Sequence, residues 1–184
     1  LTRALMVEDR LDDALHAGLW ASTGIPLGGT PLFWWWHVVE EEDYYTKFAA
    51  LSAFMSGEDR RDPKAKPVMP AVLRNGQPAA GLAAQALRGE DYATGWIHLT
   101  EAFADTDPTS APTLADLSLR MPDLANGVYV VEFWDTIEGQ VVEKETLTVR
   151  GGALVTKVPA FTRDIAFKMR RRCWVNVKKM CWIC

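Results

Sequence analysis

Three consecutive tryptophans, Trp34, Trp35 and Trp36, are followed at once by His37 in the segment TPLFWWWHVVEEEDYY. Each indole is a large, rigid apolar surface with one hydrogen-bond donor, and an imidazole can donate or accept a hydrogen bond near neutral pH. Such a cluster suits ligand binding, although the same rings can fill a protein interior and the histidine can cap a loop or face solvent. These four residues are therefore the candidate binding residues, and the element that carries them decides their role.

No comparable signal points to a catalytic group. The acidic run from Glu40 to Asp43 is expected to form a solvated loop and helix start, where the helix dipole favours negative charge. Glu8, in VEDRLDDAL, is likewise expected in a solvated helix start. The sequence has no phosphate-binding glycine loop, nucleophile elbow or paired metal-ligand motif. We therefore assign no catalytic residue and no cofactor from the sequence.

The cysteines are confined to the C-terminal tail, at Cys173, Cys181 and Cys184. Their spacing could supply three zinc thiolates, but the tail contains no histidine for the fourth position of a tetrahedral site. The basic residues around them would need a folded scaffold in order to bind nucleic acid. We expect no bound metal, and we expect residues 171–184 to form an irregular, basic, cysteine-containing tail.

Composition argues against several classes of protein. The chain has 184 residues, of which 48% are hydrophobic and 24% charged, as is ordinary for one globular domain or two small ones. Its net charge of −4 gives no overall field to attract nucleic acid or an anionic membrane. The apolar runs are shorter than the roughly 20 residues that span a bilayer. We therefore expect neither nucleic acid nor a membrane as a partner.

Two helices are predicted in the first third of the chain. Apolar residues recur every third or fourth position from Leu11 to Leu19 and again from Tyr44 to Met55. The segment GIPLGG breaks the first pattern, and Gly57 ends the second as a suitable C-terminal cap. The tryptophan run lies between the two predicted helices.

A strand is predicted between these helices, from Pro31 to Val39. Alternate side chains of a strand point to opposite faces, so Trp34 and Trp36 would share one face and Trp35 would take the other. A strand that is apolar on both faces and flanked by helices is typical of a parallel sheet covered on both sides. The order helix, strand, helix therefore indicates part of an α/β layer or barrel over residues 1–62.

From about Val68 the helical period disappears. Short β-prone runs follow one another, separated by Gly, Pro, Asp and Asn, as in an antiparallel sandwich. These runs are AGLAAQALRG, YATGWIHLT, LADLSLRM, GVYVVEFWDT, VVEKETLTVR, ALVTKVPAF and DIAFKMR. Gly139, and Gly151 or Gly152, are expected to take positive φ in hairpin turns. The predicted fold class is therefore α+β, with an antiparallel β-sandwich over residues 63–170.

The segment LHAGLWASTGIPLGGTPLFWWWHVVEEEDYYTKFAALSAFMSGED resembles the last helix, strand and helix of TIM-barrel glycoside hydrolases, in which a tryptophan-rich segment forms the eighth strand. The continuation from Gly127 to Arg170 resembles the β-sandwich that follows the barrel in many of these enzymes. One departure is His37, which stands where those sequences often have an acid. The resemblance implies a βα remnant of a TIM barrel packed on an antiparallel β-sandwich.

The resemblance also implies a function. Active sites of TIM barrels form at the C-terminal ends of the strands, which is where it would put the run from Trp34 to His37. An indole there can stack on the apolar face of a sugar ring, so the implied partner is a carbohydrate. Glycoside hydrolysis needs a carboxylic acid and a carboxylate, which in these barrels lie at the ends of strands four and seven. Both strands would precede Leu1, so the chain is expected to be an inactive piece of a longer enzyme.

Two functions from different classes remain. The first is a C-terminal fragment of a glycoside hydrolase, with the tryptophan-rich strand end in the sugar cleft and the sandwich as an accessory domain. The alternative is a non-catalytic carbohydrate-binding or protein-interaction sandwich, with Trp96 or Trp134 as an exposed platform. A buried Trp134 would favour the first function, and an exposed, coplanar pair of aromatic rings would favour the second.

A barrel strand without its neighbours is also expected to expose apolar surface and to cause self-association.

Overall fold

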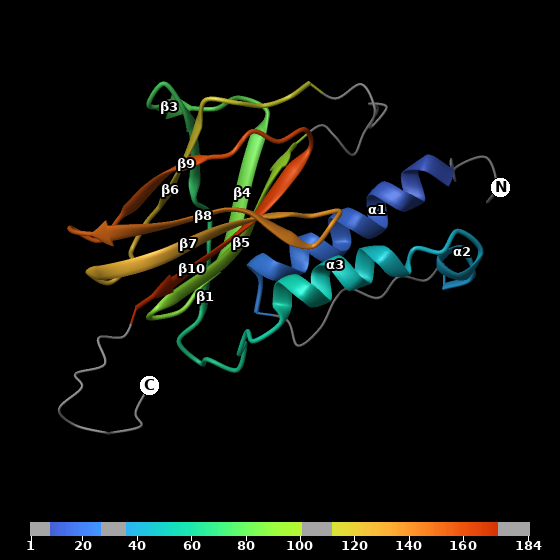
Figure 1. The fold of residues 1–184 in the computed structure, drawn as a ribbon, viewed down its shortest axis with the longest axis horizontal. Helices are drawn as coiled ribbons and strands as arrows, with labels where there is room; N and C mark the ends of the chain where they lie inside the picture. Colours follow the sequence, from blue (N-terminus) through green and yellow to red (C-terminus); the bar gives the residue numbers. More distant parts are fainter. Residues whose placement is uncertain (1–7, 27–35, 101–111, 173–184) are drawn as a thin grey trace.

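The computed structural model describes residues 8–26, 36–100 and 112–172. Within these ranges the chain forms helices at its N-terminal end and two antiparallel sheets after them, which confirms the α+β class (Figure 1). The helical elements are α1 (Glu8–Ala21), the 3-10 helix η2 (Ser22–Gly24), α2 (Trp36–Glu41) and α3 (Tyr45–Met55). None of the helices in these ranges is long and apolar enough to span a membrane.

Two sheets make up the sandwich. The larger has the strand order β1-β4-β5-β10-β7-β8 and the smaller the order β3-β2-β6-β9. The strands are β1 (Lys66–Val68), β2 (Ala71–Arg74), β3 (Gln77–Pro78), β4 (Leu82–Arg88), β5 (Tyr92–Leu99), β6 (Leu117–Met121), β7 (Gly127–Asp135), β8 (Gln140–Val149), β9 (Leu154–Val158) and β10 (Asp164–Arg171). All pairings between these strands are antiparallel. The last strand, β10, lies in the middle of the larger sheet.

The core of the sandwich is filled by alternate residues of the strands. Leu117 and Leu119 of β6 join Phe133 of β7 and Phe167 of β10 in one buried cluster. This burial follows the two-residue period of a strand, as the sequence pattern predicts. Burial of each such side chain contributes about 1.5–3 kcal/mol, so the core fixes the sheet that carries the helices.

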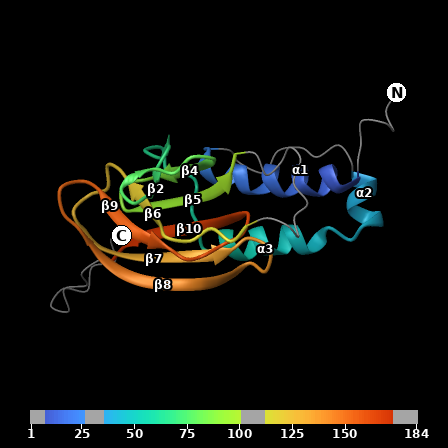
Figure 2. The same cartoon turned by 90° about the horizontal axis from the view of Figure 1, so that it is seen from above.

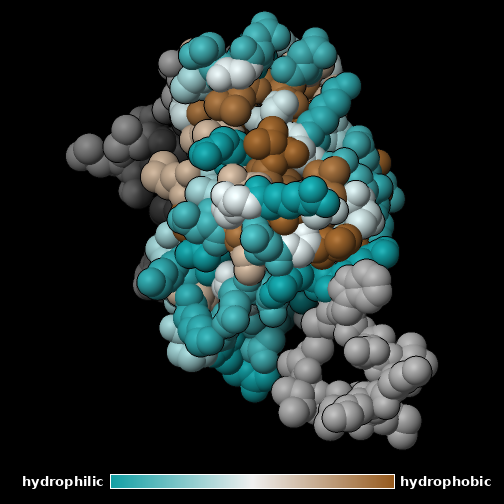
Figure 3. All heavy atoms as spheres, turned by 90° about the vertical axis from the view of Figure 1, so that its left-hand side faces the viewer, coloured by the Kyte–Doolittle hydropathy of each residue, from teal (hydrophilic) through white to brown (hydrophobic). Residues whose placement is uncertain are grey.

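Helices α1 and α3 cover the outer face of the larger sheet. Leu19 and Trp20 of α1 and Phe54 of α3 join Trp96 of β5 and Ala166 of β10 in a second buried cluster. The C-terminal halves of both helices lie against the sheet, while their N-terminal ends project beyond the end of the sandwich (Figure 2). The far end of the sandwich, viewed in Figure 3, carries apolar residues surrounded by hydrophilic ones.

The two helices run parallel to each other. Toward their N-terminal ends, Asp12 Oδ1 of α1 lies 2.5 Å from Lys47 Nζ of α3. Toward their C-terminal ends, the rings of Trp20 and Phe54 are 5.1 Å apart. Both helices therefore run from the projecting end toward the sandwich, as Figure 1 also shows. Helix α2, which precedes α3, lies at the projecting end, opposite to the end at which α1 leads into η2.

Most elements predicted from the sequence are confirmed. The two amphipathic patterns correspond to α1 and α3, and the seven β-prone runs correspond to β4 through β10. Gly139, Gly151 and Gly152 take positive φ values of 65°, 80° and 82° in their turns, and Gly57 follows α3 with φ of 76°. These positions favour glycine because a Cβ atom is strained there.

The predicted strand from Pro31 to Val39 is wrong at its C-terminal end. Residues 31–35 lie outside the described part of the chain, but Trp36–Glu41 is the helix α2. A short apolar run without alternation is compatible with either element, and among the described residues no strand pairs with residues 36–39. The backbone of α2 bonds locally instead, since the Glu42 N–H donates to the Val38 carbonyl at 2.9 Å. Part of the acidic run therefore belongs to α2 and not to the start of α3.

Candidate functional site

Trp36 and His37 lie in the first turn of α2, at the end of the molecule that projects beyond the sandwich (Figure 1). Trp36 is 76% exposed, and His37 is exposed beside it, with the two ring centroids 5.9 Å apart at an interplanar angle of 83°. Trp34 and Trp35 lie outside the described residues. The structure therefore brings two of the four predicted binding residues together on an open surface.

Tyr45, the first residue of α3, adds another exposed ring at this end. Its side chain is 53% exposed, and its hydroxyl donates a hydrogen bond to the Glu40 carboxylate of α2. This hydrogen bond, together with the negative charge of Glu40, raises the pKa of Tyr45. Sequence analysis did not single out Tyr45. It lies next to Tyr44 and off the repeating apolar face of α3, and this position was a signal that its side chain faces solvent.

The acidic residues at this end are solvated, as predicted. The side chains of Glu40, Glu41, Glu42 and Asp43 are all exposed. The aromatic surface of Trp36, His37 and Tyr45 therefore lies beside exposed carboxylates.

The two sandwich tryptophans are used to hold the helices. Trp96 of β5 is 2% exposed and stacks on His98, with ring centroids 4.2 Å apart. Trp134 of β7 is partly buried, and the ring of Phe54 meets it edge to face at 5.6 Å. Trp96 is therefore buried and Trp134 partly buried, and the two indoles do not form an exposed, coplanar pair.

Asp164 of β10 is the hydrogen-bonding centre of the junction between α1 and the sandwich. Its Oδ2 accepts hydrogen bonds from His16 Nε2 and Trp96 Nε1, each at 2.7 Å, and its Oδ1 accepts one from Thr136 Oγ1 at 2.8 Å. Burial raises the pKa of this carboxyl group, but the hydrogen bond and charge of His16 and the other two donors outweigh burial and lower it. His16 therefore acts in helix docking.

Lys168 of β10 makes a second polar contact between the helices and the sheet. Its Nζ lies 3.2 Å from Glu58 Oε1, and 4.8 Å and 4.4 Å from the ring centroids of Phe54 and Trp134. Glu58 also pairs with Arg170. The side chains of Lys168 and Glu58 are 7% and 4% exposed, so both charges are compensated inside the junction.

Sequence analysis missed this junction. The available signal was a charged residue inside an apolar strand, since Asp164 and Lys168 both belong to the run DIAFKMR. Such residues indicate that the outer face of a strand is covered by something polar. The pattern does not name the partner, because His16 and Asp164 are 148 positions apart in the sequence.

Neither a metal site nor a match to a known protein helps to assign a function to this chain. Within the described residues there is no group of three or more His, Cys, Asp or Glu side chains that could hold a metal ion, and the three cysteines lie outside those residues. No protein-family model matches the chain, and a search of curated proteins finds no match.

Proposed function

We propose that this chain is the C-terminal part of a carbohydrate-active glycoside hydrolase, carrying the last helix, strand and helix of a TIM barrel together with an accessory sandwich. The observation that carries the proposal is the parallel course of α1 and α3. In a (β/α) barrel successive helices are parallel because a strand returns the chain between them. A helical hairpin with a short loop would make them antiparallel.

The length of the connection fits a returning strand. Helix α1 has 14 residues and is about 21 Å long at 1.5 Å per residue, so about seven extended residues would return the chain to its start. The sequence between Ala21 and Tyr45 has room for such a strand and for a loop on each side. Because Trp36–Glu41 is helical, the proposed strand ends before Trp36.

The junction supports an accessory role for the sandwich. Two buried polar contacts, centred on Asp164 and Lys168, and an apolar cluster between them join the sandwich to α1 and α3. Of the aromatic residues that a free binding module would present, Trp96 is buried in this contact and Trp134 is partly buried by it. These contacts favour the glycoside hydrolase over the alternative in which the sandwich tryptophans bind a ligand.

The proposed enzyme uses the tryptophan-rich segment in its sugar cleft. Trp36 and His37 would lie just beyond the C-terminal end of the last barrel strand, at the face where TIM-barrel active sites form. Trp36 would give an apolar contact to a sugar ring, and His37 a hydrogen bond to a hydroxyl group. The acid and the carboxylate that cleave the glycosidic bond would come from barrel strands that precede this chain.

The coding sequence upstream of Leu1 tests the proposal. It is expected to encode a barrel with carboxylate residues at the ends of two strands, and the longer protein is expected to hydrolyse at least one aryl glycoside. The chain alone is expected to give no turnover. An upstream sequence without a barrel would overturn the proposal, and so would hydrolysis by the chain alone that a single Glu→Gln change abolishes.

The role of Trp36 is tested in the longer protein. Trp36→Ala should raise KM by about fivefold, because loss of one stacked aromatic contact removes on the order of 1 kcal/mol of binding. Met69→Ala is the matched control, since Met69 is 81% exposed and belongs to the sandwich. An unchanged KM in the Trp36 variant would remove this residue from the proposed cleft.

A further inference from the structure

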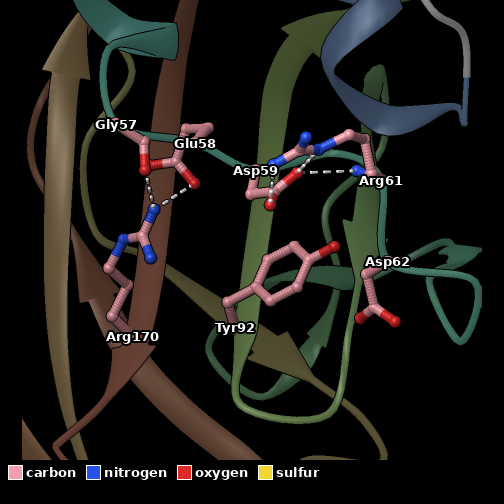
Figure 4. A pocket seen from close by; sticks show the side chains of 7 residues that line it. All are labelled: Gly57, Glu58, Asp59, Arg61, Asp62, Tyr92 and Arg170. Carbon is pink, nitrogen blue, oxygen red and sulfur yellow. Dashed lines mark hydrogen bonds and ion pairs between the residues drawn. The ribbon is translucent and has the colours of Figure 1, made fainter. Parts of the chain in front are cut away.

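A pocket of about 320 Å³ lies where the loop after α3 crosses β5 and β10 (Figure 4). Its sides are lined by Gly57, Glu58, Asp59, Arg61, Asp62 and Arg170, and Tyr92 of β5 lies between them. The volume is at the lower end of the roughly 300–1,000 Å³ range of small-molecule pockets. It therefore suits a small ligand of monosaccharide size.

The rim of the pocket presents donors and acceptors side by side. Arg61 donates two hydrogen bonds to the Asp59 carboxylate, from Nε and from one terminal nitrogen, each at 2.8 Å. Arg170 pairs with Glu58 and donates to the Gly57 carbonyl at 3.3 Å. A guanidinium has five N–H donors, so both arginines keep donors for a ligand, and their side chains are 89% and 49% exposed.

Tyr92 gives the pocket an aromatic wall. Figure 4 shows its ring between the Glu58–Arg170 pair and Asp62. The ring lies directly against Gly89 in the β4–β5 turn, where an added Cβ would come within 2.1 Å of Tyr92 Cε1 and 2.7 Å of Asp62 Oδ2. The Tyr92 hydroxyl oxygen is buried and has no hydrogen-bond partner among the described residues. A ligand in the pocket would therefore contact the ring and not the hydroxyl group.

The lining of the pocket carries charges of both signs. Its carboxylates belong to Glu58, Asp59 and Asp62, and its guanidinium groups belong to Arg61 and Arg170, which pair with Asp59 and Glu58. Most of these charges are therefore already paired within the lining. Arginine donors, carboxylate acceptors and an aromatic ring together match a neutral molecule with many hydroxyl groups and an apolar CH face.

The pocket is distinct from the surface around Trp36. Trp36 and His37 precede the N-terminal end of α3, whereas the pocket begins after its C-terminal end. The helix has 11 residues and so separates the two places by about 16 Å along its axis. One small ligand cannot occupy both.

We propose that the pocket at Tyr92 binds one neutral sugar residue, as a second carbohydrate contact outside the cleft. The sugar stacks on the Tyr92 ring, and its hydroxyl groups accept from Arg61 and Arg170 and donate to Asp62. The choice of a sugar among neutral polyhydroxyl compounds rests on the proposed function. The location of the site rests on the pocket geometry.

Titration of the ¹⁵N-labelled chain with soluble neutral oligosaccharides tests the site. The probes are cellotetraose, xylotetraose and mannotetraose, with trigalacturonate and chitotriosan as anionic and cationic comparisons. At least one neutral probe should shift the backbone amides of Gly57 and Gly89 saturably, with a dissociation constant on the order of 1 mM. No shift with any neutral probe at about 50 mM, or tighter binding of a charged probe, would overturn the proposal.

Three variants assign the binding to the pocket. Tyr92→Ala should weaken it about tenfold or more, whereas Tyr92→Phe should stay within about threefold, since the lost hydroxyl group is buried. Gly89→Ala should also weaken binding about tenfold, because the new methyl group displaces the ring and Asp62. It provides an independent variant if Tyr92→Ala does not fold.

Two controls separate this proposal from the proposed function. Val155→Ala shortens an exposed side chain on β9 of the smaller sheet and should leave binding unchanged. If Trp36→Ala abolished binding and Tyr92→Ala did not, the pocket proposal would be overturned while the glycoside hydrolase proposal stood. Conversely, amide shifts that depend on Tyr92 support the pocket even if the longer protein hydrolyses no aryl glycoside.

Discussion

Asp164 shows how one buried carboxylate can join three parts of a chain. Its donors come from α1, from β5 and from the turn after β7. A carboxylate buried without donors would cost several kcal/mol, so these three residues make its burial tolerable. Because His16 must reach the same carboxylate as Trp96 and Thr136, these hydrogen bonds also fix the position of α1 on the sheet.

Asp164→Asn should destabilise the protein by about 3 kcal/mol at pH 7, because it breaks a buried pair and leaves donors unmatched. The pKa of Asp164 is lowered in the folded state, so its contribution is present above the unfolded value near 4 and is lost as the pH falls through the folded value. Urea unfolding at several pH values measures both effects. Below about pH 4 the free energy of unfolding of the variant should fall less steeply with decreasing pH than that of the wild type.

Asp91→Asn is the control for this change. Asp91 pairs with Arg171 at 2.8 Å, but both side chains are substantially exposed, so its replacement should cost less than about 1 kcal/mol. Equal losses in the two variants would contradict a special role for Asp164.

The Tyr92 hydroxyl group is a different case, since it is buried without a partner among the described residues. Burial and the nearby charge of Asp62 raise its pKa. Tyr92→Phe should therefore raise the free energy of unfolding by about 1 kcal/mol, because it removes an unsatisfied polar group and keeps the ring. Tyr129→Phe should instead lower it by about 1 kcal/mol, since the Tyr129 hydroxyl donates to the Ala125 carbonyl at 3.1 Å. Urea unfolding of the two variants in parallel checks the opposite signs.

At the scale of elements, the turn between β7 and β8 touches α3. An added Cβ at Gly139 would lie 2.5 Å from Ala50 Cα, so the turn and the helix approach each other through a glycine and an alanine. This contact adds to the polar contacts that hold α3 on the sheet. Glycine is therefore needed at position 139 for two reasons, its positive φ and the close approach of Ala50.

Gly139→Ala should destabilise the protein by about 2–3 kcal/mol more than Gly151→Ala, measured by thermal or urea unfolding. Both glycines have positive φ, 65° and 80°, so the backbone strain is similar in the two variants. A Cβ at Gly151 meets nothing within 4 Å, so the difference reports the contact with α3. Equal losses would mean that the turn can move away from α3 at no cost.

The elements that could be predicted from the sequence are those with a clear period. Strands such as β6 were found because their apolar residues alternate. On β7, however, Val128 and Val130 are apolar as well as the buried Tyr129 and Val131, so the pattern does not reveal which face is inside. The short strands β1, β2 and β3 were missed, because two to four residues are too few to show an alternation.

The candidate site was predictable only in part, for a related reason. Aromatic residues at Trp36 and His37 stood out by type, and both are exposed. The helix that carries them did not stand out, because an all-apolar run fits two elements. The pocket at Tyr92 combines residues from three distant segments, and no local pattern marks such a combination.

At the scale of the whole molecule, the predicted boundary between residues 62 and 63 separates segments that share a buried junction. The cluster around Trp20, Phe54 and Trp96 draws on both sides of it. At the projecting end, by contrast, Trp36 of α2 is largely open to solvent. That end is therefore where the molecule is expected to meet another surface.

The purified chain should self-associate through the segment from Phe33 to Val39. An indole buries about 200 Å² when it is covered, and exposed indoles create an apolar patch that favours association. Trp35→Ser with Trp36→Ser should reduce the association seen in sedimentation without unfolding the sandwich. Val155→Ser is a control for exposed apolar residues in general, since Val155 is 57% exposed on β9. A stable wild-type monomer whose indoles are shielded from a soluble quencher would contradict the prediction.

The contact between His16 and Asp164 also sets an order of events on the ribosome. The two residues are 148 positions apart, so at about 5–20 residues per second the helix α1 emerges roughly 7–30 s before its partner strand has been translated. During that time the apolar face of α1, with Leu19 and Trp20, lacks the part of the sheet that β10 supplies. A nascent chain stopped before β10 should therefore keep this face accessible to chaperones, and translation of the final strand should release them.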